Sequence, residues 1–596
     1  MGLLQKAMET YDSHLAYASQ NREGTTMMAP VGHIVTRADL EITLDRDGSF
    51  LDACAVDKTE PKIIIPATES SAGRTSAPCA HPLCDQIGYL SPENETKYKL
   101  YVEQLTAWAV SEYSNSKLEP VLNYVKSGSV LSDLARCGLI EVDADGKLVN
   151  EKQEKLLVRW RIQGHDTEAC WLDKKLFEDF TSYYISNRSG RTMLCSLSGE
   201  ETAIAEQHPK GIISINGNAK LISANDSSGF TYRGRFTEEW QAAAVGYTAS
   251  QKAHNALRWL AQEQGVIIGG RTFLCWNPQG RKVVKPTLPL LGQREPIFYP
   301  SAYRDALADA LASRKNELKL TDGVVVTAFD AATSGRLAVT YYSEMMGYDF
   351  LQRLHDWDAS CCWPNRNFGI QSPTLKSIVD CAFGTQRTEK GSTRLETDER
   401  ILRQQIQRLI ACRVDRAAIG GDIVKALVNR ASAPHAYDRY VWENILFTAC
   451  AVIRKYRYDT FKEEWNMALE PERMDRSYQF GRLLAVMEKV ERDTYGAEEV
   501  REPNAIRLQS VFCQRPLTTA NQLDKQLERA YFPRLHPAGR VHYKNLIGQI
   551  MAVISSFPKT EWNKPLGDTY LMGYYLQRAA LYTKKNNIEM EENNHD

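Results

Sequence analysis

Hydrophobic and polar positions alternate with a period of two in the first part of the chain. Such alternation over 40–44 and 50–56, with an Asp-Gly pair between the two runs, predicts a β-hairpin. Helical spacing dominates from about residue 94 to residue 136. Further strand-like and helix-like runs then follow one another in no repeating order. This succession predicts an α+β fold for the N-terminal region, residues 1–363.

The pattern changes after residue 363. Gly, Pro and a polar run without periodicity predict a linker over 364–398. From 399 to 596, segments with helical spacing follow one another and are punctuated by prolines, so we expect a C-terminal helical bundle. A third feature is the stretch 69–85, which has no periodicity and is rich in small and polar residues. It is predicted to be a long loop.

Composition restricts the class of protein. The chain has 596 residues, of which 43% are hydrophobic and 25% charged, values typical of globular proteins. Disordered, collagen-like and disulfide-stapled small proteins are therefore excluded as descriptions of the whole chain. The 73 Lys and Arg residues against 74 Asp and Glu give a net charge of −1, which argues against a uniformly basic nucleic-acid wrapper.

Targeting signals are also not apparent. The longest relevant apolar run, 445–453, is too short for a membrane span, which needs about 20 residues. The first 20 residues contain no continuous apolar segment typical of a secretory signal. We therefore expect a cytoplasmic protein, whose 13 cysteines stay reduced, with no membrane partner.

Catalytic motifs are mostly missing from the sequence. It contains no phosphate-binding P-loop, no C-x-x-C or H-E-x-x-H zinc motif and no G-x-S-x-G nucleophile elbow. We expect no cofactor and no metal, and we expect that the protein is not an enzyme. One alternative stays open: a metal-dependent nuclease that would use His355, Asp356 and Asp358.

Local charge is less even than the total. Residues 501–560 contain nine Lys or Arg and three Asp or Glu, whereas 461–500 contain six basic and ten acidic residues. The segment 454–458, Arg-Lys-Tyr-Arg-Tyr, interleaves cations with aromatic rings, a combination suited to a nucleic-acid strand. For each of these segments, the alternative to nucleic-acid binding is a charged helix face that contacts only solvent.

Two polar loops are candidates for contacts with a nucleic-acid backbone. The first, 69–76, offers hydroxyl donors, one glycine and one arginine, so it can approach phosphates or a groove with little steric bulk. The second, 216–220, is polar and turn-prone. Ordinary surface connections would look the same.

Several sequence blocks resemble one known family. Residues 74–85 are similar to its R-T-S-G-x-x-P-H-P-L-x-D signature, and 218–225 to G-A-S-L-V-S-F-N. Residues 230–234 resemble F-x-S-Y-G, and near the C-terminus 481–490 and 571–578 resemble G-R-L-x-A-V-x-E-K-x and L-G-Y-Y-x-Q-R. The family is the large subunit of the type I-C (Dvulg subtype) CRISPR surveillance complex, Cascade. The similar blocks occur in order over nearly the whole chain.

The resemblance implies a non-catalytic role in DNA recognition. Such a subunit recognises the PAM, a short motif beside the target, in double-stranded DNA and promotes R-loop formation. It then holds the displaced strand and helps recruit a separate CRISPR helicase–nuclease. The implied partners are the guide RNA-bearing backbone and RNA-processing subunits of the complex. A small subunit made from an internal start at Met467 or Met474 is a further implied partner.

Three groups of residues are predicted to make these contacts. The PAM loop consists of Ser70, Ser71, Arg74, Thr75 and Ser76. A second group, for contacts with DNA, RNA or other subunits, consists of Asn216, Asn218 and Lys220. Contacts to the displaced strand or the heteroduplex are assigned to Arg515, Lys525, Arg529, Arg534, Arg540 and Lys544.

Overall fold

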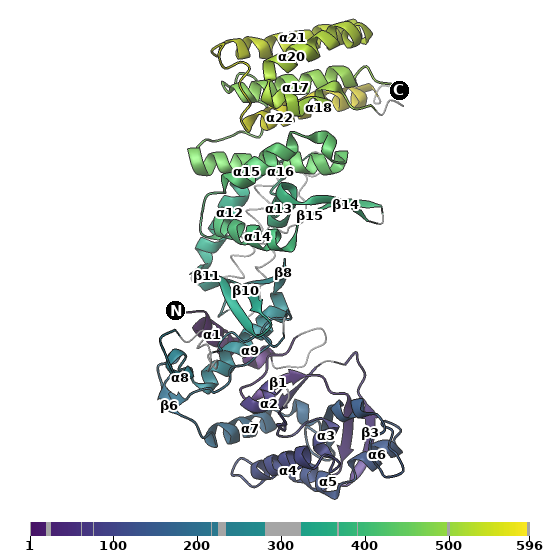
Figure 1. Cartoon of the computed structure of the whole chain (residues 1–596), viewed down its shortest axis with the longest axis vertical. Helices are drawn as coiled ribbons and strands as arrows, with labels where there is room; N and C mark the ends of the chain where they lie inside the picture. The colour runs from purple at the N-terminus through teal and green to yellow at the C-terminus, as the bar shows by residue number, and fades with distance from the viewer. Residues whose placement is uncertain are drawn as a thin grey trace. The chain divides into compact units, whose positions relative to one another are not determined.

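The structure, a computed structural model, divides into two compact units (Figure 1). Unit 1 comprises residues 1–285 and 322–344, and unit 2 comprises 286–321 and 345–596. The structure describes residues 2–18, 26–60, 62–74, 77–215, 217–223, 234–279, 323–365, 369–389, 391–496 and 501–592, and only the backbone of 332 and 583–592.

Unit 1 mixes strands and helices. Its helices are α1 (Leu3–Ala18), α2 (Glu69–Gly73), α3 (Ile87–Leu90), α4 (Glu95–Ala109), α5 (Leu118–Ser127), α6 (Val130–Arg136), α7 (Lys174–Ser186), α8 (Glu239–Ala242) and α9 (Tyr247–Gln264), with 3₁₀ turns at Glu151–Lys155 and Cys170–Leu172. Its strands are β1 (His33–Thr36), β2 (Leu40–Leu44), β3 (Phe50–Ala55), β4 (Ile63–Pro66), β5 (Val158–Ile162), β6 (Thr192–Leu194), β7 (Glu201–Ala203), β8 (Val266–Ile268), β9 (Arg271–Trp276), β10 (Gly323–Thr333) and β11 (Arg336–Met346).

The predicted hairpin is confirmed as β2 and β3. These strands pair in antiparallel register, and β5 adds to β2 in parallel to give the order β3-β2-β5. Inward-facing residues such as Ile42 and Trp160 are fully buried, in one core with Trp108 of α4 and Val121 of α5. Helices α3 to α6 lie beside this sheet (Figure 1).

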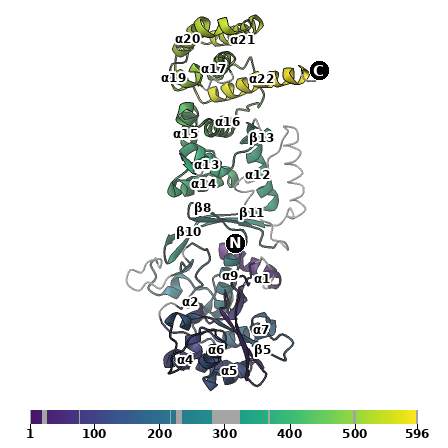
Figure 2. The ribbon, with the colours of Figure 1, turned by 90° about the vertical axis from the view of Figure 1, so that its right-hand side faces the viewer.

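A second sheet in unit 1 has the order β11-β10-β9-β8. Helices α1 and α9 pack together against it, through a core that includes Tyr11, Leu257, Leu274 and Trp276 (Figure 2). Unit 1 also contains two short antiparallel pairs, β1 with β4 and β6 with β7.

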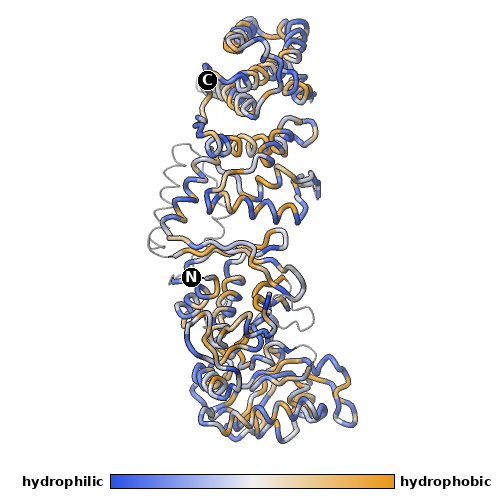
Figure 3. The backbone as a smooth tube through the Cα atoms, turned by 60° about the vertical axis from the view of Figure 1, so that its left-hand side comes forward, coloured by the Kyte–Doolittle hydropathy of each residue, from blue (hydrophilic) through white to orange (hydrophobic). Residues whose placement is uncertain are grey.

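Unit 2 is mainly helical. It contains α12 (Gly347–Ser360), α13 (Leu375–Phe383), α14 (Glu399–Val414), α15 (Gly421–Ala431), α16 (Arg439–Phe461), α17 (Arg476–Arg492), α18 (Asn504–Arg507), α19 (Gln509–Gln514), α20 (Pro516–Gln526), α21 (Pro537–Ser555) and α22 (Thr569–Glu592). Shorter elements are the 3₁₀ turns Pro434–Ala436 and Phe532–Arg534, the π-helical turn Leu527–Tyr531, and strands β12 (Trp363–Asn365), β13 (Gly369–Gln371), β14 (Thr385–Glu389) and β15 (Ser392–Glu396). Hydrophobic and hydrophilic positions alternate along these helices (Figure 3).

The chain therefore has the predicted α+β fold, with helices dominating the C-terminal part. The segment 364–398, expected to be a linker, instead contains α13 and hairpin strands that pair β12 with β13 and β14 with β15. Its glycines have local roles: Gly369 and Gly391 adopt φ of 71° and 79°, which suits tight turns, and Gly384 ends α13.

Candidate nucleic-acid interface

The predicted PAM loop begins with one short helix rather than an irregular segment. Thr68 caps α2: its side chain accepts a hydrogen bond from the Ser71 backbone N–H, while the Ser71 hydroxyl accepts one from the Thr68 N–H. This reciprocal arrangement is a capping box, which satisfies donors at the start of a helix. Ser71 is buried, and Ser70 is exposed beside it.

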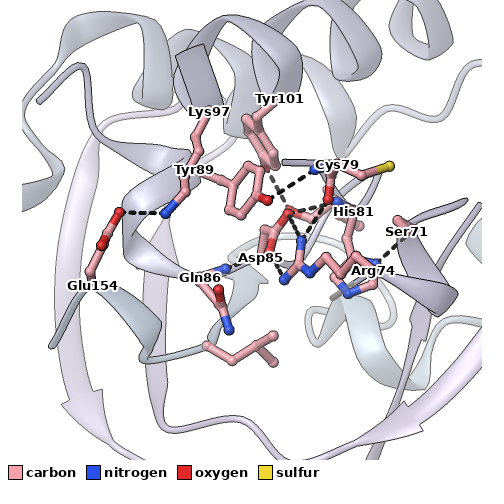
Figure 4. Close-up of polar contacts among 12 residues, drawn as sticks. Ser71, Arg74, Cys79, His81, Asp85, Gln86, Tyr89, Lys97, Tyr101 and Glu154 are labelled. Carbon is pink, nitrogen blue, oxygen red and sulfur yellow. Dashed lines mark hydrogen bonds and ion pairs between the residues drawn. The ribbon is translucent and has the colours of Figure 1, made fainter. Parts of the chain in front are cut away.

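Arg74 closes the loop through an ion pair with Asp85 (Figure 4). Its two terminal nitrogens lie 3.0 and 2.6 Å from Asp85 Oδ2 and Oδ1, and Nη1 also donates to the Cys79 carbonyl at 2.8 Å. The guanidinium lies 4.7 Å from the centroid of the Tyr89 ring. A bidentate pair of this kind is geometrically specific. The two ends of the 74–85 block therefore hold each other.

Asp85 and His81 complete this network. The fully buried Asp85 carboxylate also accepts hydrogen bonds from the backbone N–H groups of His81, at 2.6 Å, and Gln86, at 2.7 Å. His81 Nδ1 lies 2.9 Å from the Ser71 hydroxyl, and burial lowers the pKa of His81 to about 4, so the ring is neutral at pH 7. Burial alone would lower the pKa of Arg74, but the hydrogen bond and charge of Asp85 outweigh this effect and raise it.

Arg74 therefore belongs to the framework of the loop. Contact between its guanidinium and DNA would require its release from Asp85. Ser71 is likewise engaged with Thr68 and His81. Thr75 and Ser76 lie outside the described residues. Among the predicted PAM-loop residues that the structure describes, Ser70 is the one with an exposed hydroxyl group.

Glu69 connects α2 to the segment after β7. Its carboxylate accepts hydrogen bonds from the Gln207 backbone N–H at 2.7 Å and from Arg188 Nη1 at 2.8 Å. Burial raises the pKa of Glu69, although the Arg188 charge opposes that shift. Gln207 in turn lines a cavity of about 240 Å³, together with Arg191, Lys220 and other residues.

Lys220 brings the second predicted loop to the same place. It lines that cavity, and its backbone is fixed by a hydrogen bond from its N–H to the Gly335 carbonyl at 3.1 Å. Burial and the nearby Lys210 charge lower the pKa of Lys220. Asn218 is exposed on the preceding turn, and Asn216 lies outside the described residues. Lys220 thus lies near α2, because it lines the same cavity as Gln207, whose backbone N–H donates to Glu69 of α2.

Sequence reasoning missed the residues that join the two loops. Gln207, His208 and Arg191 line the cavity, and Arg191 lies 4.1 Å above the Trp240 ring. Burial, with the charges of His254 and Lys220, lowers the pKa of His208 to about 3. No motif marked these positions, because they converge only when β6, β7 and α9 are folded.

The basic residues assigned to the displaced strand divide into two groups. Arg534 donates to the Thr494 carbonyl, Arg540 to the Phe532 and Pro533 carbonyls, and Lys544 pairs with Glu528 at 2.7 Å. The other three side chains are exposed, and among the described residues they form no ion pair: Arg515, Lys525 and Arg529. Lys525 and Arg529 are four residues apart at the junction of α20 with the π-helical turn.

The residues of the alternative nuclease site do not converge on one point. Asp358 is buried in an ion pair with Arg413 at 2.9 Å, whereas Asp356 is exposed and pairs with Arg416 at 2.8 Å. His355 Nδ1 lies 3.8 Å from Asp356. Among the described residues, no group of three or more His, Cys, Asp or Glu side chains could hold a metal ion.

The two C-terminal sequence blocks pack against each other in α17 and α22. Arg482 Nε donates to Gln577 at 3.0 Å, and Tyr574 donates to the buried Glu488. Arg578 Nε lies 3.8 Å from Glu488. The charges of Arg578 and Arg492 outweigh the effect of burial and lower the pKa of Glu488. These blocks therefore form a buried polar interface between helices.

No helix in the described part of the chain is both long and apolar enough to cross a membrane.

Comparison with known proteins identifies the family. A search of curated proteins finds no match. The family described as CRISPR-associated protein (Cas_Csd1) matches residues 12–582, nearly the whole chain. The protein therefore belongs to this family of CRISPR-associated proteins.

Proposed function

We propose that this chain is the large subunit of a type I-C CRISPR Cascade complex, in which it recognises the PAM in double-stranded DNA and promotes R-loop formation. The observation that carries the proposal is the family match over residues 12–582. Membership of a CRISPR-associated family implies participation in a complex of Cas proteins. The guide RNA-bearing and RNA-processing subunits are the proposed partners, in the cytoplasm.

The geometry of unit 1 supports the PAM-reading part of the proposal. A capping box and the Arg74–Asp85 pair fix α2, which carries the exposed Ser70. Lys220, which lines the neighbouring cavity, makes no ion pair among the described residues and so keeps an uncompensated charge for a phosphate or a base edge. A fixed loop beside a cation is suited to reading a short duplex element.

The proposed role is non-catalytic. A separate helicase–nuclease would cleave the target, and this subunit would help recruit it. The alternative, a metal-dependent nuclease, receives no support from the separated positions of His355, Asp356 and Asp358. A product started at Met467 or Met474 would contain helices α17 to α22, which is consistent with a separately made small subunit.

Lys220→Gln is expected to weaken binding of PAM-containing duplex to the assembled complex by about tenfold, equivalent to about 1.4 kcal/mol. The substitution removes the charge and leaves a polar side chain that is one atom shorter. Binding to DNA already opened at the target is expected to change much less, because the PAM is read in the duplex. Electrophoretic mobility shift titrations with both substrates measure the difference.

Lys99→Gln is the matched control for this experiment. Lys99 is an exposed lysine in α4 of the same unit, away from the cavity. Equal losses on the two DNA substrates, or equal effects of the two lysine substitutions, would contradict a role of Lys220 in PAM reading.

Lys525 and Arg529 are proposed to contact the phosphates of the displaced strand. Replacing both with Ala is expected to reduce the dependence of log K on log salt by about 1.4, since each lost contact with single-stranded DNA removes about 0.7. Fluorescence anisotropy of labelled single-stranded DNA, titrated over a range of salt concentrations, measures this slope.

Lys544→Ala provides the comparison for the double variant. Its ammonium group is already paired with Glu528, so its loss should leave the slope almost unchanged. A double variant with the wild-type slope would mean that Lys525 and Arg529 do not contact the strand.

A further inference from the structure

A separate cavity of about 850 Å³ lies within unit 2. Its walls come from α12, the end of α14, the C-terminal half of α16 and the segment that follows α16. It shares no residue with the loops of unit 1 or with the basic residues assigned to the displaced strand. Its size is within the usual range for small-molecule sites.

Six basic residues line this cavity, and they fall into two sets. Three are paired with carboxylates: Arg413 with Asp358, Arg416 with Asp356, and Lys455 with Asp459. The other three are held by backbone carbonyls: Arg353 by Val414, Arg454 by Ala359 and Trp465, and Lys462 by Asp459. A carbonyl positions a cation without cancelling its charge.

The carboxylates on the wall are fewer and mostly neutralised. Asp356 and Asp459 pair with the cations named above, and Glu470 pairs with Arg473. Glu463 lies 3.5 Å from Arg457, which pairs more closely with Asp568. Glu464 is exposed and forms no ion pair among the described residues. With six Lys or Arg and five Asp or Glu residues on its wall, the cavity has a surplus of one positive charge, which favours an anionic ligand.

Backbone conformation singles out two of the basic residues. Arg416 and Lys462 have φ of 59° and 58°, and no other non-glycine residue in the described part of the chain has positive φ. Lys462 adopts this left-handed conformation at the C-terminal cap of α16. The conformation is unfavourable for an L-residue, and such strain concentrates at functional sites. Both residues line this cavity. Glycine would be the less strained choice at either position unless the side chain is needed.

The wall also offers an aromatic surface and buried polar atoms. Tyr458 is 45% exposed, and Lys462, one helical turn later, has its Nζ 5.9 Å from the centroid of the Tyr458 ring. An exposed ring beside cations suits stacking of a nucleobase. Nδ1 of His355 and Oδ2 of Asp459 are buried without a hydrogen-bond partner among the described residues. A ligand with donors and acceptors would satisfy such atoms.

We propose that this cavity binds a nucleoside phosphate. Arg454 and Lys462 would contact the phosphate, together with Arg416, whose solvent-exposed ion pair with Asp356 would be exchanged for the ligand. The base would stack on Tyr458. The same chemistry occurs in a free nucleotide and in the 5′-terminal nucleotide of a strand. The site is independent of PAM reading, because it uses other residues in the other unit.

Binding to the purified full chain tests the proposal with two fluorescent probes. One is a dATP analogue, and the other is a short oligodeoxynucleotide labelled at its 3′ end and carrying a 5′ phosphate. The wild type is expected to bind at least one of them at micromolar to millimolar concentration. The variants are Arg416→Gly and Lys462→Gly, each expected to weaken binding about tenfold.

These glycine substitutions separate a binding defect from a folding defect. Glycine adopts positive φ without the cost that Arg416 and Lys462 bear, so the melting temperature of either variant should be equal to or above that of the wild type. Lys559→Gly removes an exposed charge in the same unit outside the cavity, and should bind both probes as the wild type does.

The two probes also distinguish the source of the ligand. Binding of the dATP analogue, lost in the glycine variants, identifies a free-nucleotide site. A strand-end site is identified if the protein binds the 5′-phosphorylated oligonucleotide but not the dATP analogue. In that case the glycine variants should lose this binding, and the 5′-hydroxyl form of the oligonucleotide should bind weakly. Absence of binding of either probe at millimolar concentration, or wild-type affinity in both glycine variants, would overturn the proposal. Equal affinity for the two oligonucleotide forms, with no binding of the dATP analogue, would also overturn it.

Discussion

Gly481→Ala is expected to unfold the C-terminal part of unit 2 under conditions in which the wild type is stable. A Cβ atom at this position of α17 would lie 1.9 Å from the Tyr570 carbonyl oxygen at the start of α22. The partner glycine has the same role, since a Cβ on Gly573 would lie 2.1 Å from the Tyr478 carbonyl oxygen. Both obstacles are backbone atoms, so only separation of the two helices could relieve the clash.

The expected cost of this substitution is at least about 3 kcal/mol, the upper range for overpacking in a core. It also disturbs the buried Arg482–Gln577 hydrogen bond and the Arg578–Glu488 ion pair, which require the helices to stay in register. Differential scanning calorimetry of the full chain would measure the loss as a lower melting temperature of the transition that involves α17 and α22.

Gly548→Ala is the matched control. Gly548 lies inside α21, and a Cβ there would have no atom within 4 Å, so alanine is expected to stabilise the helix by about 0.5–1 kcal/mol. If Gly481→Ala left the melting temperature unchanged, close contact of α17 with α22 through these glycines would be wrong.

Arg74→Ala is expected to destabilise unit 1 by about 3–5 kcal/mol, because it leaves the Asp85 carboxylate buried without its partner. Asp85 cannot simply be exposed, since it also accepts two backbone N–H groups that fix the following turn. Arg74→Lys should destabilise unit 1 less than Arg74→Ala does, because lysine keeps the charge. It should still be less stable than the wild type, because lysine loses the bidentate geometry. Thermal unfolding of the three proteins gives the order.

Arg37→Ala is the control for this series. Arg37 is an exposed arginine of the same unit and bonds only to the Lys58 carbonyl among the described residues. Equal melting temperatures for Arg74→Ala and Arg37→Ala would contradict a structural role of the Arg74–Asp85 pair. A loss of duplex binding in Arg74→Ala would not by itself show contact with DNA, because the variant also loosens the loop. Lys220 is therefore the more informative position.

Much of the fold follows from periodicity, and the exceptions have physical reasons. The hairpin of β2 and β3 was predictable because its alternating residues face a buried core on one side. Helix α2 was not, because its five residues depend on the Thr68 capping box and on tertiary contacts of Glu69. The supposed linker was misinterpreted since its glycines mark turns and a helix end within folded structure.

The candidate site was predictable only in part. The sequence indicated both loops, but the spacing of Arg74 and Asp85 does not reveal that they pair. The sequence also does not show that Lys220 approaches α2. The Gln207–Glu69 hydrogen bond brings the two loops together only after β7 and α9 have folded. In sequence, the exposed cations Lys525 and Arg529 were indistinguishable from Lys544, which pairs with Glu528.

Photocrosslinking of the assembled complex to a duplex with one photoreactive base in the PAM tests the central claim most directly. The proposed function predicts crosslinks to this chain within residues 69–85 or 216–223, and their loss when the PAM sequence is changed. Crosslinks confined to another subunit, or to unit 2 of this chain, while the complex still binds the duplex, would contradict PAM reading by these loops.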